Sequence, residues 1–263
     1  MDPRESIVYQ IWPRSFYDTD GDGIGDLPGV TAKLDYLHEL GIDTIWLSPI
    51  FPSPNNDYGY DISDYRSVNP EFGTMADFDK LVAEAKVRNI KILLDLVPNH
   101  TSDQHAWFRQ AIADPSSKYR DYYIFRKGKN GGAPNNWMSF FGGSSWTKDE
   151  KSAEYYLTSF TPQQCDLNWE NPALRADMYD MMRFWMDKGI GGFRIDVVNL
   201  LKKPAGLPDK NPEKRGLQFP GKLITAQSGI HDILREMNEE VFAKYPGCMT
   251  VGEGCLVGID DEP

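Results

Sequence analysis

Five short, nearly continuous apolar runs divide the chain and constrain its fold more than any other feature. They occupy residues 7–11, 44–48, 90–97, 192–198 and 248–252. A strand that is apolar on both sides has to be covered on both faces, which is typical of a parallel sheet whose crossover connections are helices. The runs therefore predict an α/β fold built around a parallel sheet.

The segments between the runs carry helical patterns with recognisable ends. Apolar side chains at helical spacing over residues 30–40 predict one helix that ends at Gly41. Thr74 and Asn171 can act as N-caps of two further helices, and another helix is predicted over residues 233–241. Strand and helix thus alternate, as successive β/α units require.

One long segment breaks this alternation. Residues 101–168 have little long periodicity and many Gly, Asn, Trp and Tyr residues. A connection of this length should have a structure or a function of its own. We therefore expect a first part of the main domain over residues 1–100, an inserted domain over 101–168, and a continuation over 169–263.

The composition excludes some classes of partner. Hydrophobic residues make up 40% of the 263 residues, which is enough for a large core. The net charge of −11 and the pI of about 4.9 argue against nucleic acid and anionic membranes as partners. The seven Trp and thirteen Tyr residues are either core residues or platforms for stacking on sugars.

The N-terminal segment and the cysteines bear on cellular location. Residues 1–10 contain no basic segment followed by an apolar one, and no run reaches the length of a membrane span. Cys165, Cys248 and Cys255 are odd in number and fit no zinc pattern, so we expect reduced thiols. Both observations predict a cytoplasmic protein.

Two of the apolar runs end in charged groups that suggest catalysis. The fourth run contains Arg194 and Asp196, and Glu253 directly follows the fifth. Burying an unpaired charge is costly, and the carboxyl ends of the strands of a β/α barrel carry the catalytic groups. Two carboxylates on consecutive strands can act as the nucleophile and the general acid of a retaining glycosidase.

The expected roles of these groups follow from their neighbours. Residues two apart in a strand share a face, so Arg194 should lie beside Asp196 and keep it ionised, as a nucleophile requires. Glu253 has no cation near it in the sequence. An apolar setting would raise its pKa, as a general acid requires. The alternative is a structural Arg–Asp pair.

Four motifs resemble conserved regions of one enzyme family. Asp95–His100, Gly192–Val198 and Val251–Glu253 resemble the first three conserved regions of the α-amylase family of glycoside hydrolases, and Gln164–Trp169 resembles a further region. The chain looks most similar to the oligo-1,6-glucosidases and related α-glucosidases. The resemblance implies a (β/α)8 TIM-type barrel, a small domain inserted after the third strand, and a C-terminal β-domain.

The resemblance also implies roles for individual residues. Asp196 would be the nucleophile and Glu253 the acid/base, with their carboxyl groups about 5–5.5 Å apart, as in retaining enzymes. The remaining site residues implied to bind substrate are Asp57, Tyr60, His100, Arg194 and Val197.

Val197 follows the nucleophile at the position that sorts substrates in these relatives. Val at this position is found with α-1,6 linkages, whereas Thr or Ala is found with α-1,4 linkages. Val lacks the hydroxyl group of Thr and is bulkier than Ala, so the leaving-group side of the site changes in shape and polarity. The alternative is that Val197 is simply a good strand residue.

An acidic loop lies a few residues after the first apolar run. Residues 18–26 place carboxylates at alternate positions, which suits the hard oxygen ligands of Ca²⁺. The loop is not an EF-hand, because Gly29 occupies the twelfth position, where a bidentate Glu is required. The resemblance implies one structural Ca²⁺, and a solvated acidic turn is the alternative. The ligands would be Asp18, Asp20, Asp22, Asp26 and the carbonyl group of Ile24.

The chain also departs from the family pattern. The fourth conserved region, a His-Asp pair after the seventh strand, is absent, and Gly254 and Cys255 replace the Met-Pro that often follows the acid. Because five strands cannot close a barrel of eight, we expect the chain to need the remaining strands and the C-terminal β-domain. We expect it to be inactive alone.

The implied function is that of a retaining, exo-acting α-glucosidase that cleaves α-1,6 bonds of short oligosaccharides. A sucrose isomerase and a trehalose-6-phosphate hydrolase of the same fold are alternatives. A third alternative is a non-catalytic relative, such as the heavy chain of an amino-acid transporter. No nucleic acid or membrane partner is expected.

Overall fold

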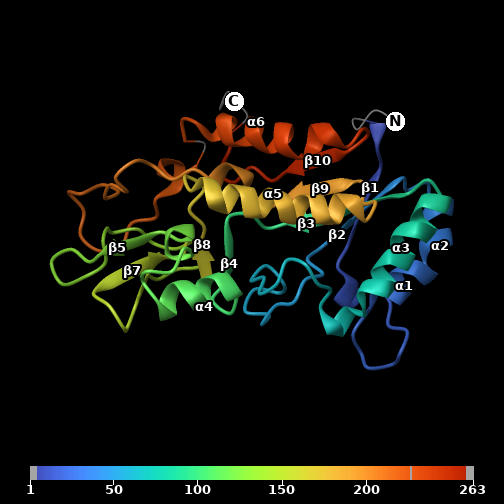
Figure 1. Cartoon of the computed structure of the whole chain (residues 1–263), viewed down its shortest axis with the longest axis horizontal. Helices are drawn as coiled ribbons and strands as arrows, with labels where there is room; N and C mark the ends of the chain where they lie inside the picture. The colour runs from blue at the N-terminus through green and yellow to red at the C-terminus, as the bar shows by residue number, and fades with distance from the viewer. Residues whose placement is uncertain (1–4, 226, 259–263) are drawn as a thin grey trace.

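Five parallel strands form the main sheet of the chain (Figure 1). The computed structural model describes residues 5–225 and 227–258. The strands are paired in the order β1-β2-β3-β9-β10. Their bounds are β1 Val8–Ile11, β2 Thr44–Leu47, β3 Lys91–Leu96, β9 Gly192–Ile195 and β10 Met249–Gly252. The five predicted strands and their parallel pairing are confirmed.

The register of the last three strands aligns their carboxyl ends. Arg194 of β9 pairs with Asp95 of β3 on one side and with Val251 of β10 on the other. Ile195 is opposite Gly252. Asp196 and Glu253 therefore follow directly after paired residues of adjacent strands, and both leave the sheet at the same edge.

Helices connect the strands of the main sheet. They are α1 Leu27–Ala32, α2 Leu34–Glu39, α3 Met75–Val87, α5 Pro172–Asp187 and α6 Ile230–Glu240. Thr74 forms a capping box with Asp77, and the Asn171 side chain accepts hydrogen bonds at the start of α5, so both predicted N-caps are confirmed. Among the described residues, no helix combines the length and the apolar character needed to cross a membrane.

The prediction of one continuous helix over residues 30–40 is wrong. The first helix already begins at Leu27, because Asp26 accepts a hydrogen bond from the Gly29 N–H as its N-cap. Lys33 has φ −100° and ψ 3°, which is outside the helical region and separates α1 from α2. Apolar spacing continues across this break, so the pattern alone does not reveal it.

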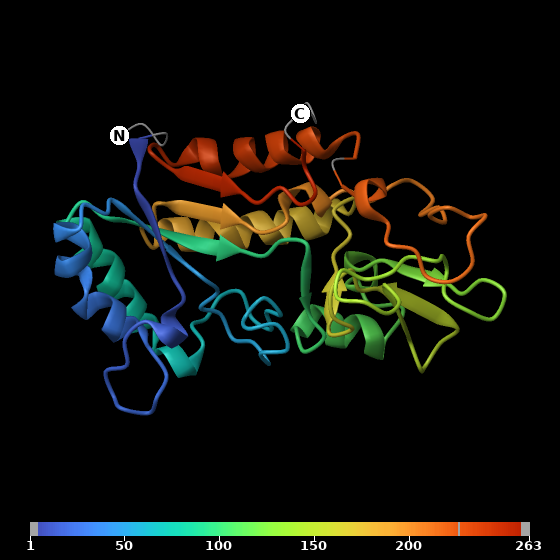
Figure 2. The ribbon, with the colours of Figure 1, turned by 180° about the vertical axis from the view of Figure 1, so that it is seen from behind.

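The core lies between the sheet and its helices. In Figures 1 and 2, α5 lies against β9, and α6 runs beside β10. Trp185 of α5 is fully buried, packs against Phe51 and Phe78, and donates its indole N–H to the Tyr65 carbonyl group at 2.7 Å. This hydrogen bond satisfies the polar atom of the buried ring, so α5 can bury its whole apolar face.

The segment after β3 forms separate small sheets. Strands β4 His100–Ser102 and β8 Gln164–Asp166 pair antiparallel. A second sheet consists of β5 Phe125–Lys127, β6 Trp146–Lys148 and β7 Glu154–Leu157, and helix α4 spans Ala106–Ala113. These elements lie beside the carboxyl ends of β3 and β9 (Figures 1 and 2). The separate sheets support our proposal that residues 101–168 are an inserted domain.

Short 3₁₀ helices complete the described structure. They are Pro13–Ser15, Pro70–Phe72, Arg120–Tyr122, Val198–Leu200, Gly221–Leu223 and Phe242–Lys244.

Replacing Asp26 should test its role as a cap. Its buried carboxylate accepts hydrogen bonds from Gly29 N–H at 2.6 Å and from the Thr19 N–H and hydroxyl group at 2.9 and 2.8 Å. Asp26→Ala should lower the free energy of unfolding by about 2 kcal/mol, because these donors lose their acceptor. Urea unfolding in the presence of EDTA measures the effect without any contribution from bound cations.

Asp26→Asn is the matched control for this prediction. Its amide oxygen can still accept from Gly29, so it should retain more stability than Asp26→Ala. Equal stability of the two variants, or no loss in either, would contradict the capping role.

Candidate active site

Three carboxylates surround one guanidinium group at the carboxyl ends of β3, β9 and β10. Arg194 Nη1 lies 3.0 Å from Asp95 Oδ1 and donates to Asp196 Oδ1 at 2.7 Å. The other terminal nitrogen, Nη2, lies 2.6 Å from Glu253 Oε2. The strand register brings these groups together, because Asp95 and Arg194 are paired residues.

The three carboxylates differ in exposure. The side chain of Asp95 is 0% exposed, that of Asp196 is 10% exposed, and that of Glu253 is 42% exposed. The side chain of Asp95 therefore has no contact with solvent. Glu253 can reach a ligand that approaches from solvent, and the exposure of Asp196 is intermediate.

Burial raises the pKa values of the inner carboxylates. Burial raises the pKa of Asp95 to about 6, although Arg194 and the hydrogen bonds from Trp46 and Tyr60 oppose the shift. Burial, followed by the charge of Asp95, raises the pKa of Asp196 well above its usual value. The charge of Arg194 and its hydrogen bond oppose this shift, which is the direction of the effect that we expected from the sequence.

Glu253 has no cation near it in the sequence, but the structure supplies one. Arg194 is its direct ion-pair partner, although the two residues are far apart in the sequence. The sequence offered no sign of this contact, which arises from the pairing of β9 with β10.

Val197 has an unusual backbone conformation beside the two carboxylates. It has φ 37° and ψ 45°, in the left-handed region that β-branched residues rarely adopt. In this conformation the Val197 N–H donates to Glu253 Oε2 at 3.3 Å, and the Val198 N–H donates to the Glu253 carbonyl oxygen at 3.1 Å. Val197 is buried and lies beyond the end of β9, so it is not an ordinary strand residue.

Tyr60 and Trp46 hold Asp95 in place. The Tyr60 hydroxyl group and the Trp46 indole N–H both donate to Asp95 Oδ2, at 3.1 and 3.0 Å. The guanidinium of Arg194 also lies 4.8 Å from the centre of the Trp46 ring. Asp95 therefore orders the site through hydrogen bonds.

His100 is neutral and tightly held. Its Nε2 lies 3.1 Å from the Tyr60 carbonyl oxygen, which can only accept, so this nitrogen carries the hydrogen. Its Nδ1 accepts from the Asn99 side-chain amide at 3.1 Å. Burial lowers the pKa of His100 to about 4, which agrees with this neutral tautomer.

The side chain of Gln164 lies next to both His100 and Asp57. Its amide nitrogen donates to Asp57 Oδ2 at 2.8 Å and lies 3.0 Å from His100 Nε2. Burial raises the pKa of Asp57, and the hydrogen bond from Gln164 opposes the shift. Asp57 and Tyr60, which belong to one loop, are thus brought together with His100 from a separate segment.

Sequence reasoning missed a buried lysine next to these groups. Lys203 Nζ lies 2.8 Å from Asp166 Oδ2 and donates to Asn99 Oδ1 and to the Leu200 carbonyl oxygen, each at 2.7 Å. Burial alone would raise the pKa of Asp166, but Lys203 and the hydrogen bonds from Ser159 lower it. This ion pair fastens the loop after β9 to β8 of the small sheets.

An open cavity of about 510 Å³ adjoins Tyr60. Exposed aromatic side chains of Trp12 and Tyr58 line it, with ring centres 5.8 Å apart in an edge-to-face arrangement. Gln10 and Ser48 add polar groups. Apolar ring faces beside polar groups suit the binding of a sugar.

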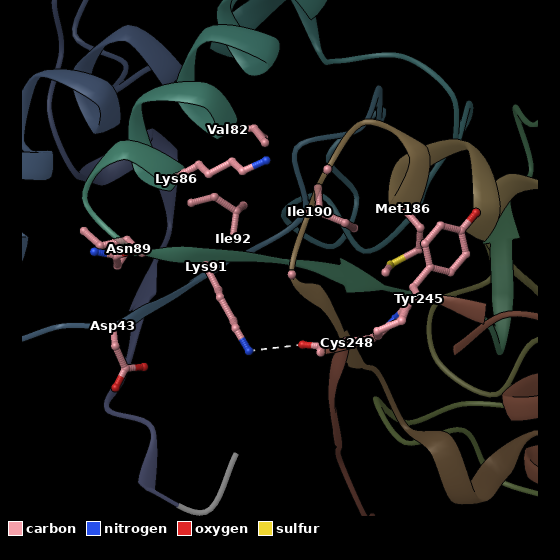
Figure 3. A pocket seen from close by; sticks show the side chains of 15 residues that line it. Asp43, Val82, Lys86, Asn89, Lys91, Ile92, Met186, Ile190, Tyr245 and Cys248 are labelled. Carbon is pink, nitrogen blue, oxygen red and sulfur yellow. Dashed lines mark hydrogen bonds between the residues drawn. The ribbon is translucent and has the colours of Figure 1, made fainter. Parts of the chain in front are cut away.

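A second cavity lies at the opposite ends of the strands (Figure 3). Its volume is about 560 Å³, and its lining includes Lys91, Ile190 and Cys248 at the amino ends of β3, β9 and β10. Asp43 is the carboxylate in its lining, and both its oxygens accept hydrogen bonds, from Ile7 N–H and the Thr44 hydroxyl group. This cavity lacks a pair of carboxylates and is not the catalytic candidate.

The acidic loop brings together three of its predicted ligands. Oxygen atoms of Asp18, Asp20 and Asp22 all lie within 4.8 Å of one another. Asp18 accepts hydrogen bonds from the Gly21 and Gly23 N–H groups, which lower its pKa. The Asp26 carboxylate is instead engaged with Thr19 and Gly29, as described above. Three convergent hard oxygen donors fit Ca²⁺.

Comparisons with known proteins agree with this geometry. A family model described as the alpha-amylase catalytic domain matches residues 10–258. The oligo-1,6-glucosidase of Parageobacillus thermoglucosidasius is 54% identical over 252 residues, which are 95% of this chain and 44% of that protein. The chain therefore spans less than half the length of this relative.

Two solved structures show the same fold. Trehalose-6-phosphate hydrolase of Bacillus licheniformis aligns with a TM-score of 0.94 at 49% identity, covering 98% of this chain and 46% of that protein. Isomaltulose synthase from Klebsiella sp. LX3 aligns with a TM-score of 0.94 at 50% identity, covering 99% of this chain and 46% of that protein. The five parallel strands are thus successive strands of a (β/α)8 barrel, and the chain belongs to the alpha-amylase family, as part of its catalytic domain.

Proposed function

We propose that the protein containing this chain is a retaining, exo-acting α-glucosidase that cleaves α-1,6 bonds of short oligosaccharides. The observation that carries the proposal is the pair Asp196 and Glu253, held on one guanidinium at the ends of adjacent strands. Similarity to oligo-1,6-glucosidases supports the substrate class. The unpaired cysteines favour a reducing compartment, so the cytoplasm is the proposed location.

The proposed reaction has two steps. In the first, Asp196 attacks the anomeric carbon while Glu253 donates its proton to the glycosidic oxygen, so that the leaving sugar departs with its hydroxyl group restored. In the second, Glu253 takes a proton from water, the water oxygen attacks the anomeric carbon, and Asp196 is released. Two inversions give net retention of the anomeric configuration.

The cluster can hold the proton that the first step needs. Three carboxylates share one guanidinium, so a proton on one of them relieves the repulsion among their charges. A proton on Glu253 leaves Arg194 paired with Asp95 and Asp196. Glu253 is also the most exposed of the three and therefore the best placed to meet a leaving group.

The remaining groups would bind the sugar at the cleavage point. Asp57, Tyr60 and His100 are proposed to contact it, with Gln164 holding Asp57 in position by a hydrogen bond. Arg194 is proposed to orient both catalytic carboxylates.

Two other activities of the same fold remain candidates because of specific similarities. Isomaltulose synthase and trehalose-6-phosphate hydrolase match this chain about as well as the glucosidases do. Product analysis with sucrose and with trehalose 6-phosphate separates these activities from hydrolysis of isomaltose. A non-catalytic relative is disfavoured, because the chain keeps the buried carboxylates and their shared cation.

Substitution of the two carboxylates in the full-length protein should test their roles. Asp196→Asn should abolish turnover, and Glu253→Gln should reduce kcat/KM for isomaltose by roughly 10²–10⁴-fold, because it removes the general acid. NMR of the first glucose released should show the α-anomer. Asp180→Asn, at an exposed acid of α5, should leave activity unchanged. Initial release of β-glucose, or substantial activity of Asp196→Asn, would defeat the assignment.

Substitution of Val197 should test the proposed linkage preference. The ratio of kcat/KM for isomaltose to that for maltose should exceed one, and Val197→Thr should shift it towards maltose by roughly 10–200-fold, as one side chain in a pocket can. Val198→Thr makes the same change one residue further on and should leave the ratio nearly constant. A wild-type ratio below one, or equal shifts in both variants, would rule out Val197 as the determinant.

We also propose a structural Ca²⁺ in the loop 18–26, held mainly by Asp18, Asp20 and Asp22, with the Ile24 carbonyl group and Asp26 as the further ligands implied by the family. Chelation should lower the melting temperature, and a Ca²⁺ concentration about 100 times the dissociation constant should restore about 2.7 kcal/mol of stability. Asp20→Asn should weaken this response, whereas Asp114→Asn, in a separate exposed turn, should not. An identical melting temperature with and without chelator would contradict the Ca²⁺ site and favour the alternative, a solvated acidic turn.

A further inference from the structure

Asn199 makes a two-way connection between the loops that follow β9 and β10. Its side-chain amide donates to the Cys255 carbonyl oxygen at 2.8 Å, and its side-chain oxygen accepts from the Cys255 N–H at 2.9 Å. Asn199 is buried, so water does not compete for these bonds. Nothing in the roles assigned above uses this residue.

The connection lies just beyond the residue proposed as the general acid. The Glu253 N–H donates to the Ile195 carbonyl oxygen at 2.9 Å, and the Glu253 carbonyl oxygen accepts from Val198 N–H at 3.1 Å. These bonds hold the start of the loop after β10. The next residue, Gly254, has no side chain to restrict its backbone, so a further anchor is needed to define the direction of the loop.

The anchor comes from the segment that carries the proposed nucleophile. Asn199 is three residues after Asp196, in the 3₁₀ helix Val198–Leu200, and its partner is two residues after Glu253. A displacement of the Cys255 backbone would therefore carry Glu253 away from Asp196. The Asn199 bonds thus join the segment after Glu253 to the segment after Asp196.

We propose that Asn199 is a positioning residue that holds the Glu253 carboxyl group at the oxygen of the leaving group. This inference rests on the proposed function. It adds a residue whose effect on the reaction passes through Glu253 and not through contact with substrate. A misplacement of about 1 Å in a catalytic group can cost roughly 100-fold in rate.

The dependence of rate on the leaving group distinguishes positioning from general stability. Cleavage of isomaltose needs a proton on its leaving oxygen, whereas α-glucosyl fluoride releases fluoride with little help from an acid. In the full-length protein, Asn199→Ala should lower kcat/KM for isomaltose roughly 100-fold. It should lower kcat/KM for α-glucosyl fluoride only a few-fold.

Three variants complete the experiment. Glu253→Gln shows how the loss of the acid itself separates the two substrates. Asn199→Asp keeps the acceptor for the Cys255 N–H but loses the donor, so it should show a smaller selective loss and is informative even if Asn199→Ala folds poorly. Asn135→Ala removes a buried asparagine that bonds the Leu207 carbonyl group elsewhere, and it should affect both substrates equally.

The outcomes separate the inference from the function on which it rests. If Glu253→Gln is selective for isomaltose but both Asn199 variants lose the two activities equally, or lose neither, Asn199 has no positioning role. If Glu253→Gln shows no selectivity, the acid assignment of Glu253 fails, and the inference fails with it.

Discussion

The guanidinium group of Arg194 is the interaction on which the site depends. It contacts Asp95, Asp196 and Glu253 at 3.0, 2.7 and 2.6 Å, and its side chain is only 11% exposed. Removing Arg194 would leave the buried carboxylates of Asp95 and Asp196 without a cation, which is strongly destabilising. The single positive charge of Arg194 cannot neutralise all three carboxylates. Burial raises the pKa values of Asp95 and Asp196, and the excess of carboxylates over cations lets the cluster hold a proton.

The parallel sheet assembles this cluster through register alone. Asp95, Arg194 and Val251 are side-by-side residues on three strands, so the residues that follow each strand emerge at one edge. The small sheets then close one side of the site. Lys203, which bonds Asp166, Asn99 and the Leu200 carbonyl group, joins them to the loop after β9. The main sheet supplies the charges, and the inserted segment supplies Gln164, whose amide group orients Asp57.

The parts of this arrangement that the sequence could predict are those set by local pattern. Continuous apolar runs mark the strands, and charged residues at their ends mark Asp196 and Glu253. The Lys203–Asp166 pair was not predictable in this way, because Lys203 lies in a loop without a regular pattern, far in the sequence from Asp166 in β8. The Arg194–Glu253 contact was missed because it depends on the pairing of β9 with β10, which joins residues far apart in the sequence. The break at Lys33 was missed because apolar spacing runs across it unchanged.

The strained backbone conformation of Val197 depends on the structure around it. A β-branched residue in the left-handed region costs on the order of 1–3 kcal/mol. In this conformation two successive N–H groups donate hydrogen bonds to Glu253. These bonds fix the position of Glu253 relative to Asp196 and offset part of the strain. A backbone in a strained state relaxes unless its surroundings hold it on both sides. On one side the Asp196 N–H donates to the Leu96 carbonyl oxygen at 2.8 Å. On the other side Asn199 is bonded to Cys255, so relaxation of Val197 would have to break the connection between the two loops.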